Sequence, residues 1–124
     1  MISDSSRTSL RIELERLFKE HQQLKFPPPN HDDKISELND LLVPYDSYVA
    51  STIMRILREN QFSSDPLHMG LDEDPDLQRK IDRLTSAYAP NTRVGLIARR
   101  YGAYYEHIKQ MVHVARSYVS ASRS

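Results

Sequence analysis

Two side chains near the C-terminus are of types that together can perform phosphate chemistry. Arg100 and His107 are separated by six residues. Seven steps along a helix return to nearly the same face, so the guanidinium and the imidazole would share one surface. A histidine can transfer protons and an arginine can stabilise a phosphate without a metal ion. The pair is therefore a candidate catalytic site, and its simpler interpretation is a surface arginine and a helical histidine.

The segment around this pair is basic and contains several tyrosines. Residues 92–124 contain six Lys/Arg and one acidic residue, Glu106, whereas residues 1–91 contain 11 Lys/Arg and 16 Asp/Glu. Such a segment can dock on the acidic part of its own chain or bind an acidic partner such as nucleic acid. Cations bind phosphates and aromatic rings stack on bases, which defines the candidate contact residues. They are Arg99, Arg100, Tyr104, Tyr105, Lys109 and Arg116.

Sequence patterns typical of other chemistries do not occur. The chain has no cysteine, which excludes disulfides and cysteine-bound zinc. Its five histidines lack the spacing of metal ligands such as H-E-x-x-H. The acidic run over residues 72–76 lacks the spacing of an EF-hand loop, and helix capping explains it. We therefore expect no cofactor, no metal, no small-molecule ligand and no enzymatic activity.

A resemblance to one group of ribonucleases provides an alternative. The spacing of Arg100 and His107 is similar to the R-x(4–6)-H signature of HEPN-type helical RNases and toxins, which are all-α and often dimeric. That resemblance implies metal-free cleavage of RNA, in which His107 moves protons and Arg100 stabilises the phosphate. It is the remote alternative to a protein without catalytic activity.

A second resemblance concerns the backbone of the same segment. The stretch IARRYG followed by YYEHIKQM resembles the helix-turn-helix of bacterial DNA-binding proteins, in which a glycine permits the turn. It implies a turn at Gly102, with Arg99 and Arg100 near the phosphate backbone. The recognition helix would contain Tyr104, Tyr105, His107, Lys109 and Gln110.

The competing interpretation is one uninterrupted helix. Apolar residues keep three- and four-residue steps from Val94 to Val119, which predicts a helix of about 28 residues. Gly102 would then be an interior position where another helix approaches closely. Gly95 would cost about 1 kcal/mol inside a short first helix, which also favours the continuous helix.

The rest of the chain shows helical periodicity interrupted by proline. The first predicted helix carries His21 on its apolar face, as a packed histidine, and ends before the prolines at 27–29. Two helices are predicted over residues 33–43 and 47–60, separated by Pro44, with Asp46 capping the second.

A further helix is predicted to begin at Pro75, after the capping residue Asp74, and to end before Pro90. The predicted connecting and terminal segments are a Pro-rich connector over residues 26–32, a loop over 61–73 and a frayed tail over 120–124.

These elements predict a single all-α domain over residues 1–124, a compact bundle of four to five helices with a long basic C-terminal helix; the alternative is a C-terminal helix-turn-helix. No apolar run approaches the roughly 20 residues that span a bilayer, and the N-terminus lacks a signal-peptide pattern. We expect a cytoplasmic, non-enzymatic regulatory or accessory protein, without membrane contact, that contacts a partner through its basic, tyrosine-bearing C-terminal surface. The candidate partners are another protein, a second copy of the chain, and DNA or RNA. A protein–protein adaptor or homodimer is the alternative.

Overall fold

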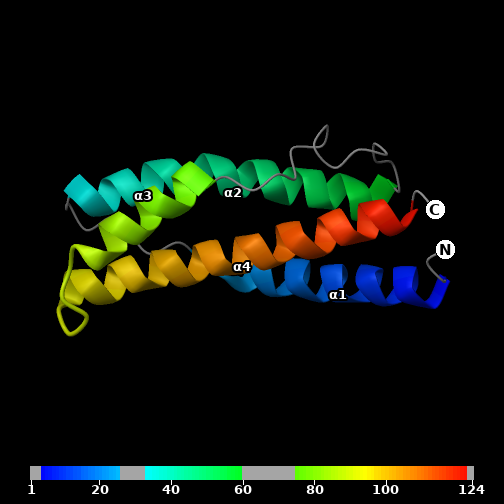
Figure 1. The fold of residues 1–124 in the computed structure, drawn as a ribbon, viewed down its shortest axis with the longest axis horizontal. Coiled ribbons are helices and arrows are strands. Elements are labelled where there is room, and N and C mark those ends of the chain that lie inside the picture. Colours follow the sequence, from blue (N-terminus) through cyan, green and yellow to red (C-terminus); the bar gives the residue numbers. More distant parts are fainter. Residues whose placement is uncertain (1–3, 26–32, 60–74, 123–124) are drawn as a thin grey trace.

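The computed structural model describes residues 4–25, 33–59 and 75–122. All regular secondary structure in these residues is helical, so the predicted all-α bundle is confirmed. The helices are α1 (Asp4–Gln23), α2 (Asp33–Glu59), α3 (Pro75–Ser86) and α4 (Arg93–Ser122). Figure 1 shows an elongated bundle in which α1 runs antiparallel to α4 and α2 runs in the same direction as α4. The start of α1 and the end of α4 lie at one end of this bundle.

Helix α1 packs through the apolar stripe that its sequence predicts. Leu14, Leu17 and His21 are buried, whereas Leu24, just beyond the helix, is 42 % exposed. Steps of three and four residues place the buried side chains on one face, which lies against α4. The prediction that His21 is a packed histidine is confirmed by its burial.

Helix α2 corrects the prediction of two separate helices. It continues through Pro44, which was expected to stop the first of them. An interior proline costs about 3 kcal/mol, mainly because it removes one backbone hydrogen bond and crowds the preceding turn. The helix nevertheless continues because Leu42 before the proline and Val49 and Ile53 after it all bury completely. Each buried side chain contributes about 1.5–3 kcal/mol, which offsets the cost of Pro44.

Helix α3 begins at Pro75, as predicted, and buries Leu77, Ile81 and Leu84 on one face. It ends at Ser86, a few residues before Pro90, which was predicted to stop it. The predicted cap Asp74 lies outside the described residues, as do the connector over residues 26–32 and the loop over 61–73.

Helix α4 runs without a break through Gly102, so the helix-turn-helix alternative is corrected. Thr92 caps its start, because the Gly95 backbone N–H donates to the Thr92 hydroxyl at 3.0 Å. At the other end the helix reaches Ser122, and Ala121 is buried. Residues 120–122 of the predicted frayed tail are thus helical; residues 123–124 lie outside the description.

Two apolar clusters lie one after the other along the bundle, and α4 belongs to both. The first joins α1 and the second half of α2 to the second half of α4. The second joins the first half of α2 and α3 to the first half of α4. Three tyrosines of α4 are core residues: Tyr101, Tyr104 and Tyr105. Helix α4 is therefore the central element, and only part of its circumference is free to face solvent.

Candidate functional site

A depression lies between the C-terminal end of α1 and the first half of α4. Its volume is about 570 Å³. The antiparallel arrangement of the two helices brings the end of α1 to this part of α4 (Figure 1). The lining residues are Gln23, Leu24, Lys25, Arg100, Ala103, Tyr104 and His107. We call this the α1–α4 depression; the described residues that line it include cations and no carboxylate.

Two permanent cations face the α1–α4 depression from different segments. Lys25 follows the end of α1, and Arg100 lies on α4; both are exposed. Within the described part of the chain, neither forms an ion pair with a carboxylate. Positive charges without a partner at a concave surface attract anions.

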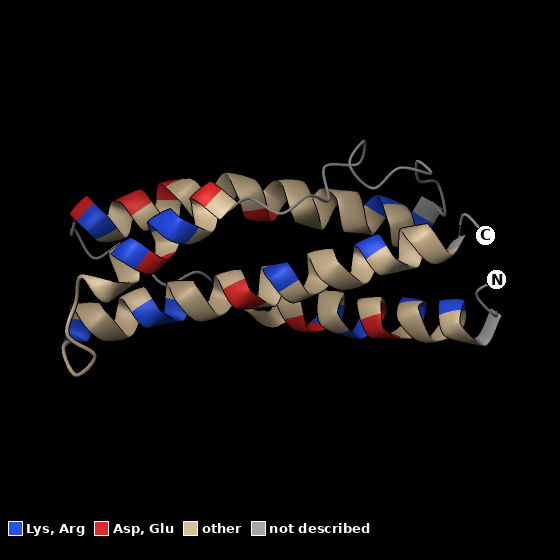
Figure 2. Ribbon diagram, viewed as in Figure 1, with Lys and Arg blue, Asp and Glu red and all other residues tan. Residues whose placement is uncertain are grey.

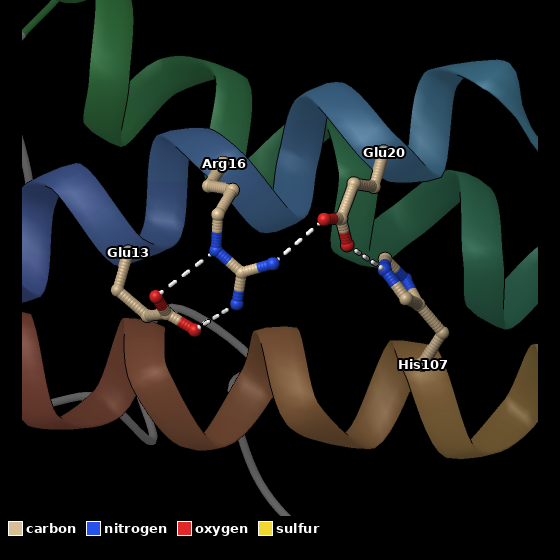
Figure 3. Close-up of polar contacts among 4 residues, drawn as sticks. All are labelled: Glu13, Arg16, Glu20 and His107. Atoms are coloured by element: carbon tan, nitrogen blue, oxygen red, sulfur yellow. Dashed lines mark hydrogen bonds and ion pairs between the residues drawn. The ribbon is translucent and has the colours of Figure 1, made fainter.

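His107 lies deeper in the same depression. Its side chain is 16 % exposed, and its Nε2 lies 3.5 Å from Oε2 of Glu20. Nη1 of Arg16 donates to Oε1 of the same carboxylate at 2.6 Å. Arg16 also binds Glu13 (Figure 3). The hydrogen bond to Glu13 raises the pKa of Arg16 and lowers that of Glu13, so this ion pair stays charged. The chain of ion pairs on α1 thus fixes the carboxylate that faces His107.

A second histidine supports His107 from behind. The rings of His21 and His107 stack in parallel, with centroids 5.5 Å apart and planes 10° apart. His21 is 5 % exposed, and its Nε2 pairs with Oδ1 of Asp46 on α2. The edge of Tyr104 meets the His21 ring at a centroid distance of 5.2 Å. Three helices therefore hold the imidazole of His107 in place.

Sequence reasoning missed the partner of His21. Asp46 was expected to cap a helix, but it lies inside α2 and binds His21 instead. A buried histidine needs a polar partner, which is the signal that His21 on an apolar stripe provides. The sequence did not indicate which acid supplies it, because 25 residues separate the two.

The structure buries both of the tyrosines that were predicted to stack on bases. Tyr104 is 8 % exposed and Tyr105 is 2 % exposed. Neither presents a ring face large enough for a base. Burial, and to a lesser extent the charge of Asp46, raise the pKa of Tyr104 to about 12, so its hydroxyl stays protonated.

Lys109 is engaged within the bundle. Its Nζ donates to Oε1 of Gln78 on α3 at 2.5 Å and lies 3.0 Å from Oε1 of Glu106. It also forms a cation–π contact with the Tyr105 ring, whose centroid lies 5.4 Å away. This predicted contact residue therefore stabilises the packing of α3 on α4.

Arg116 is half-buried and lies far along α4 from the α1–α4 depression. Sixteen residues separate it from Arg100, which is about 24 Å along a helix. The structure therefore does not place Arg116 or Lys109 in one site with Arg99 and Arg100.

A second depression extends the basic surface toward the start of α4. Its volume is about 520 Å³, and Arg93, Leu96, Ile97 and Arg100 line it. Leu96 is 55 % exposed between the two arginines. Figure 2 shows Lys and Arg along these first turns of α4, whereas Asp and Glu occur on α1 and on the first half of α2.

No group of three or more His, Asp or Glu is placed to hold a metal ion in residues 4–25, 33–59 and 75–122. None of the helices that the structure describes is both long and apolar enough to cross a bilayer.

Comparison with protein-family models, curated proteins and solved structures finds no match for the chain.

Proposed function

We propose that this chain is a small binding protein that holds the phosphate backbone of RNA or DNA on the first half of α4. One observation carries the proposal: Arg93, Arg99 and Arg100 are exposed and form no ion pair with any described residue. The acidic residues in the described part of the chain therefore leave these arginines available to an external anion.

The burial of Tyr104 and Tyr105 defines the kind of binding. Since neither tyrosine exposes its ring, the proposed binding does not rely on base stacking by these two residues. Contacts from arginine to phosphate are electrostatic and carry no sequence information. The proposed binding is therefore tolerant of sequence and sensitive to salt.

A titration of labelled single-stranded RNA and DNA at several salt concentrations tests this function. Each arginine that contacts a phosphate contributes roughly 0.7–0.9 to the slope of log affinity against log salt. The triple variant Arg93→Gln, Arg99→Gln, Arg100→Gln is expected to lower this slope by about 2 and to weaken binding at low salt.

A variant of equal charge serves as the matched control. Arg7, Arg55 and Arg58 are exposed on the start of α1 and the second half of α2, away from the first half of α4. The triple change to glutamine there is expected to leave most of the affinity intact. Absence of salt-dependent binding at micromolar protein, or an equal loss in the control, would overturn the proposal.

The second candidate is RNA cleavage of the HEPN type, because Arg100 and His107 line the same depression. In that case His107 would transfer protons and Arg100 would stabilise the phosphate. The RNA of the same titration, incubated and separated by length, decides between the two. Shorter products that disappear with both Arg100→Gln and His107→Gln support cleavage; intact RNA eliminates it.

A further inference from the structure

The geometry points to the α1–α4 depression as a site for a phosphomonoester, the terminal phosphate of a nucleic-acid strand. This inference rests on the proposed function and names the part of the ligand that enters the site. Lys25 and Arg100 supply the charge, and the volume of the depression exceeds that of a bare phosphate.

The number of charges favours a terminal phosphate. A phosphomonoester carries about −1.5 to −2 at pH 7, whereas each internal phosphodiester carries −1. Lys25 and Arg100 provide two positive charges that converge on one depression from two segments of the chain. Among the described residues that line the depression there is no carboxylate, and the nearby Glu20, which faces His107, is itself paired with Arg16. One dianion balances both cations, whereas one diester leaves one of them without a partner.

The shape of the depression gives the second argument. Its volume of about 570 Å³ exceeds that of a bare phosphate and lies in the range of small-ligand pockets, about 300–1,000 Å³. Leu24 and Ala103 provide apolar wall for an attached nucleoside, while Tyr104 and His107 add polar edges. We expect the end of a strand to enter this depression with its phosphate between Lys25 and Arg100.

The fixed position of His107 gives the third argument. Stacking on His21 and the ion pair of Glu20 with Arg16 hold its ring at the back of the depression before any ligand arrives. Preorganised groups lose little conformational entropy on binding. The remaining strand is positioned to follow α4 toward Arg93, because Arg100 lines both depressions.

Three oligonucleotides of one sequence test the inference: one with a 5′ phosphate, one with a 3′ phosphate and one with neither. Binding is compared at constant ionic strength. At least one phosphorylated form is expected to bind about tenfold more tightly than the unphosphorylated form, which is the size of one charge-assisted contact. Lys25→Gln and Arg100→Gln should each remove this preference.

Arg93→Gln is the matched control, since Arg93 lines only the second depression. It is expected to weaken all three oligonucleotides alike and to leave the preference unchanged. Equal affinity of the phosphorylated and unphosphorylated forms in the wild-type protein would overturn the inference while leaving backbone binding intact.

A nucleoside monophosphate, inorganic phosphate and the free nucleoside complete the experiment as competitors. Competition by the monophosphate at lower concentration than inorganic phosphate supports a site for the phosphate with its nucleoside. Backbone amide shifts of Gln23 and Ala103 on addition of the monophosphate locate it. If the monophosphate binds but no oligonucleotide does, the depression is a nucleotide site and the proposed nucleic-acid function fails. If the monophosphate neither competes nor shifts these amides, the terminal-phosphate site is overturned.

Discussion

Tyr104 combines a core position with a place at the edge of the α1–α4 depression. Its ring packs against His21 and is 8 % exposed. Removing water from a phenol disfavours its ionised form, and a nearby carboxylate does the same. These two causes raise the pKa of Tyr104 to about 12. The hydroxyl is therefore neutral at any pH at which nucleic-acid binding would be measured.

The raised pKa of Tyr104 predicts a loss of stability at alkaline pH. In the unfolded chain a tyrosine loses its proton near pH 10, whereas the folded chain retains it to about pH 12. The unfolded state therefore becomes relatively more favourable as pH rises between these values. The free energy of unfolding is expected to fall by at most about 1 kcal/mol per pH unit from this residue, since its partial contact with solvent reduces the full 1.4.

Urea unfolding of the wild type and Tyr104→Phe at pH 8, 9.5 and 11 checks this expectation. Phenylalanine has no proton to lose, so the variant should gain stability relative to the wild type only above pH 10. Tyr48, which is 54 % exposed, provides the control substitution Tyr48→Phe. A constant difference between Tyr104→Phe and the wild type across this range would contradict the assigned environment.

At the scale of the element, α4 contains two glycines whose surroundings differ sharply. A Cβ at Gly102 would lie 3.7 Å from Cγ2 of Thr85, which is ordinary contact. A Cβ at Gly95 would overlap the carbonyl oxygen of Ala89 and lie 2.9 Å from Oγ1 of Thr92. Gly95 is therefore required by the turn that leads into α4, whereas Gly102 is an interior glycine beside α3.

Alanine substitutions at these positions are expected to have opposite effects. Gly102→Ala should raise the free energy of unfolding by about 0.5–1 kcal/mol, because alanine favours a helix and space is available. Gly95→Ala should lower it, because the clash with Ala89 outweighs the same gain in helix propensity. Chemical unfolding measures both. Destabilisation by Gly102→Ala would instead indicate that the chain turns at this position.

The sequence predicted the helices well where the apolar periodicity was long. It failed where a rule about a single residue conflicted with the burial of the residues around it. Continuous three- and four-residue steps indicated that α4 passes through Gly102. Pro44 indicated a helix end, but apolar residues on both sides of it share one buried face, and their packing dominates. Asp46 indicated a helix start for the same local reason. A rule about one residue takes no account of the apolar area that the neighbouring residues bury.

At the scale of the whole molecule, the sequence located the basic segment but not which of its residues are available. Tyr104 and Tyr105 look like surface residues beside arginines, and only the placement of α4 between the other helices explains their burial. Lys25 was not predicted as a site residue. It joins Arg100 because α1 runs antiparallel to α4, which is a property of the assembled bundle (Figure 1).

Long-range polar contacts also hold the helices together. Arg11 makes two of them near the end of the bundle that contains the start of α1 and the end of α4. This side chain donates to the carbonyl of Leu57 on α2 at 2.6 Å and to the Tyr118 hydroxyl on α4 at 3.0 Å. The hydrogen bond to Tyr118 is the main cause of the raised pKa of Arg11. Arg11 on α1 thus links α1 to α2 and α4.

Arg11→Met is expected to lower the free energy of unfolding by about 1–2 kcal/mol, because it leaves the Leu57 carbonyl without its donor while keeping the apolar stem. The control is Arg16→Met: Arg16 pairs with Glu13 and Glu20 on its own helix, and exposed pairs of this kind contribute only about 0.3–0.5 kcal/mol. A double-mutant cycle with Tyr118→Phe should show coupling to Arg11 and none to Arg16. Equal losses from both arginine variants, without coupling to Tyr118, would mean that packing alone holds the terminal end of the bundle.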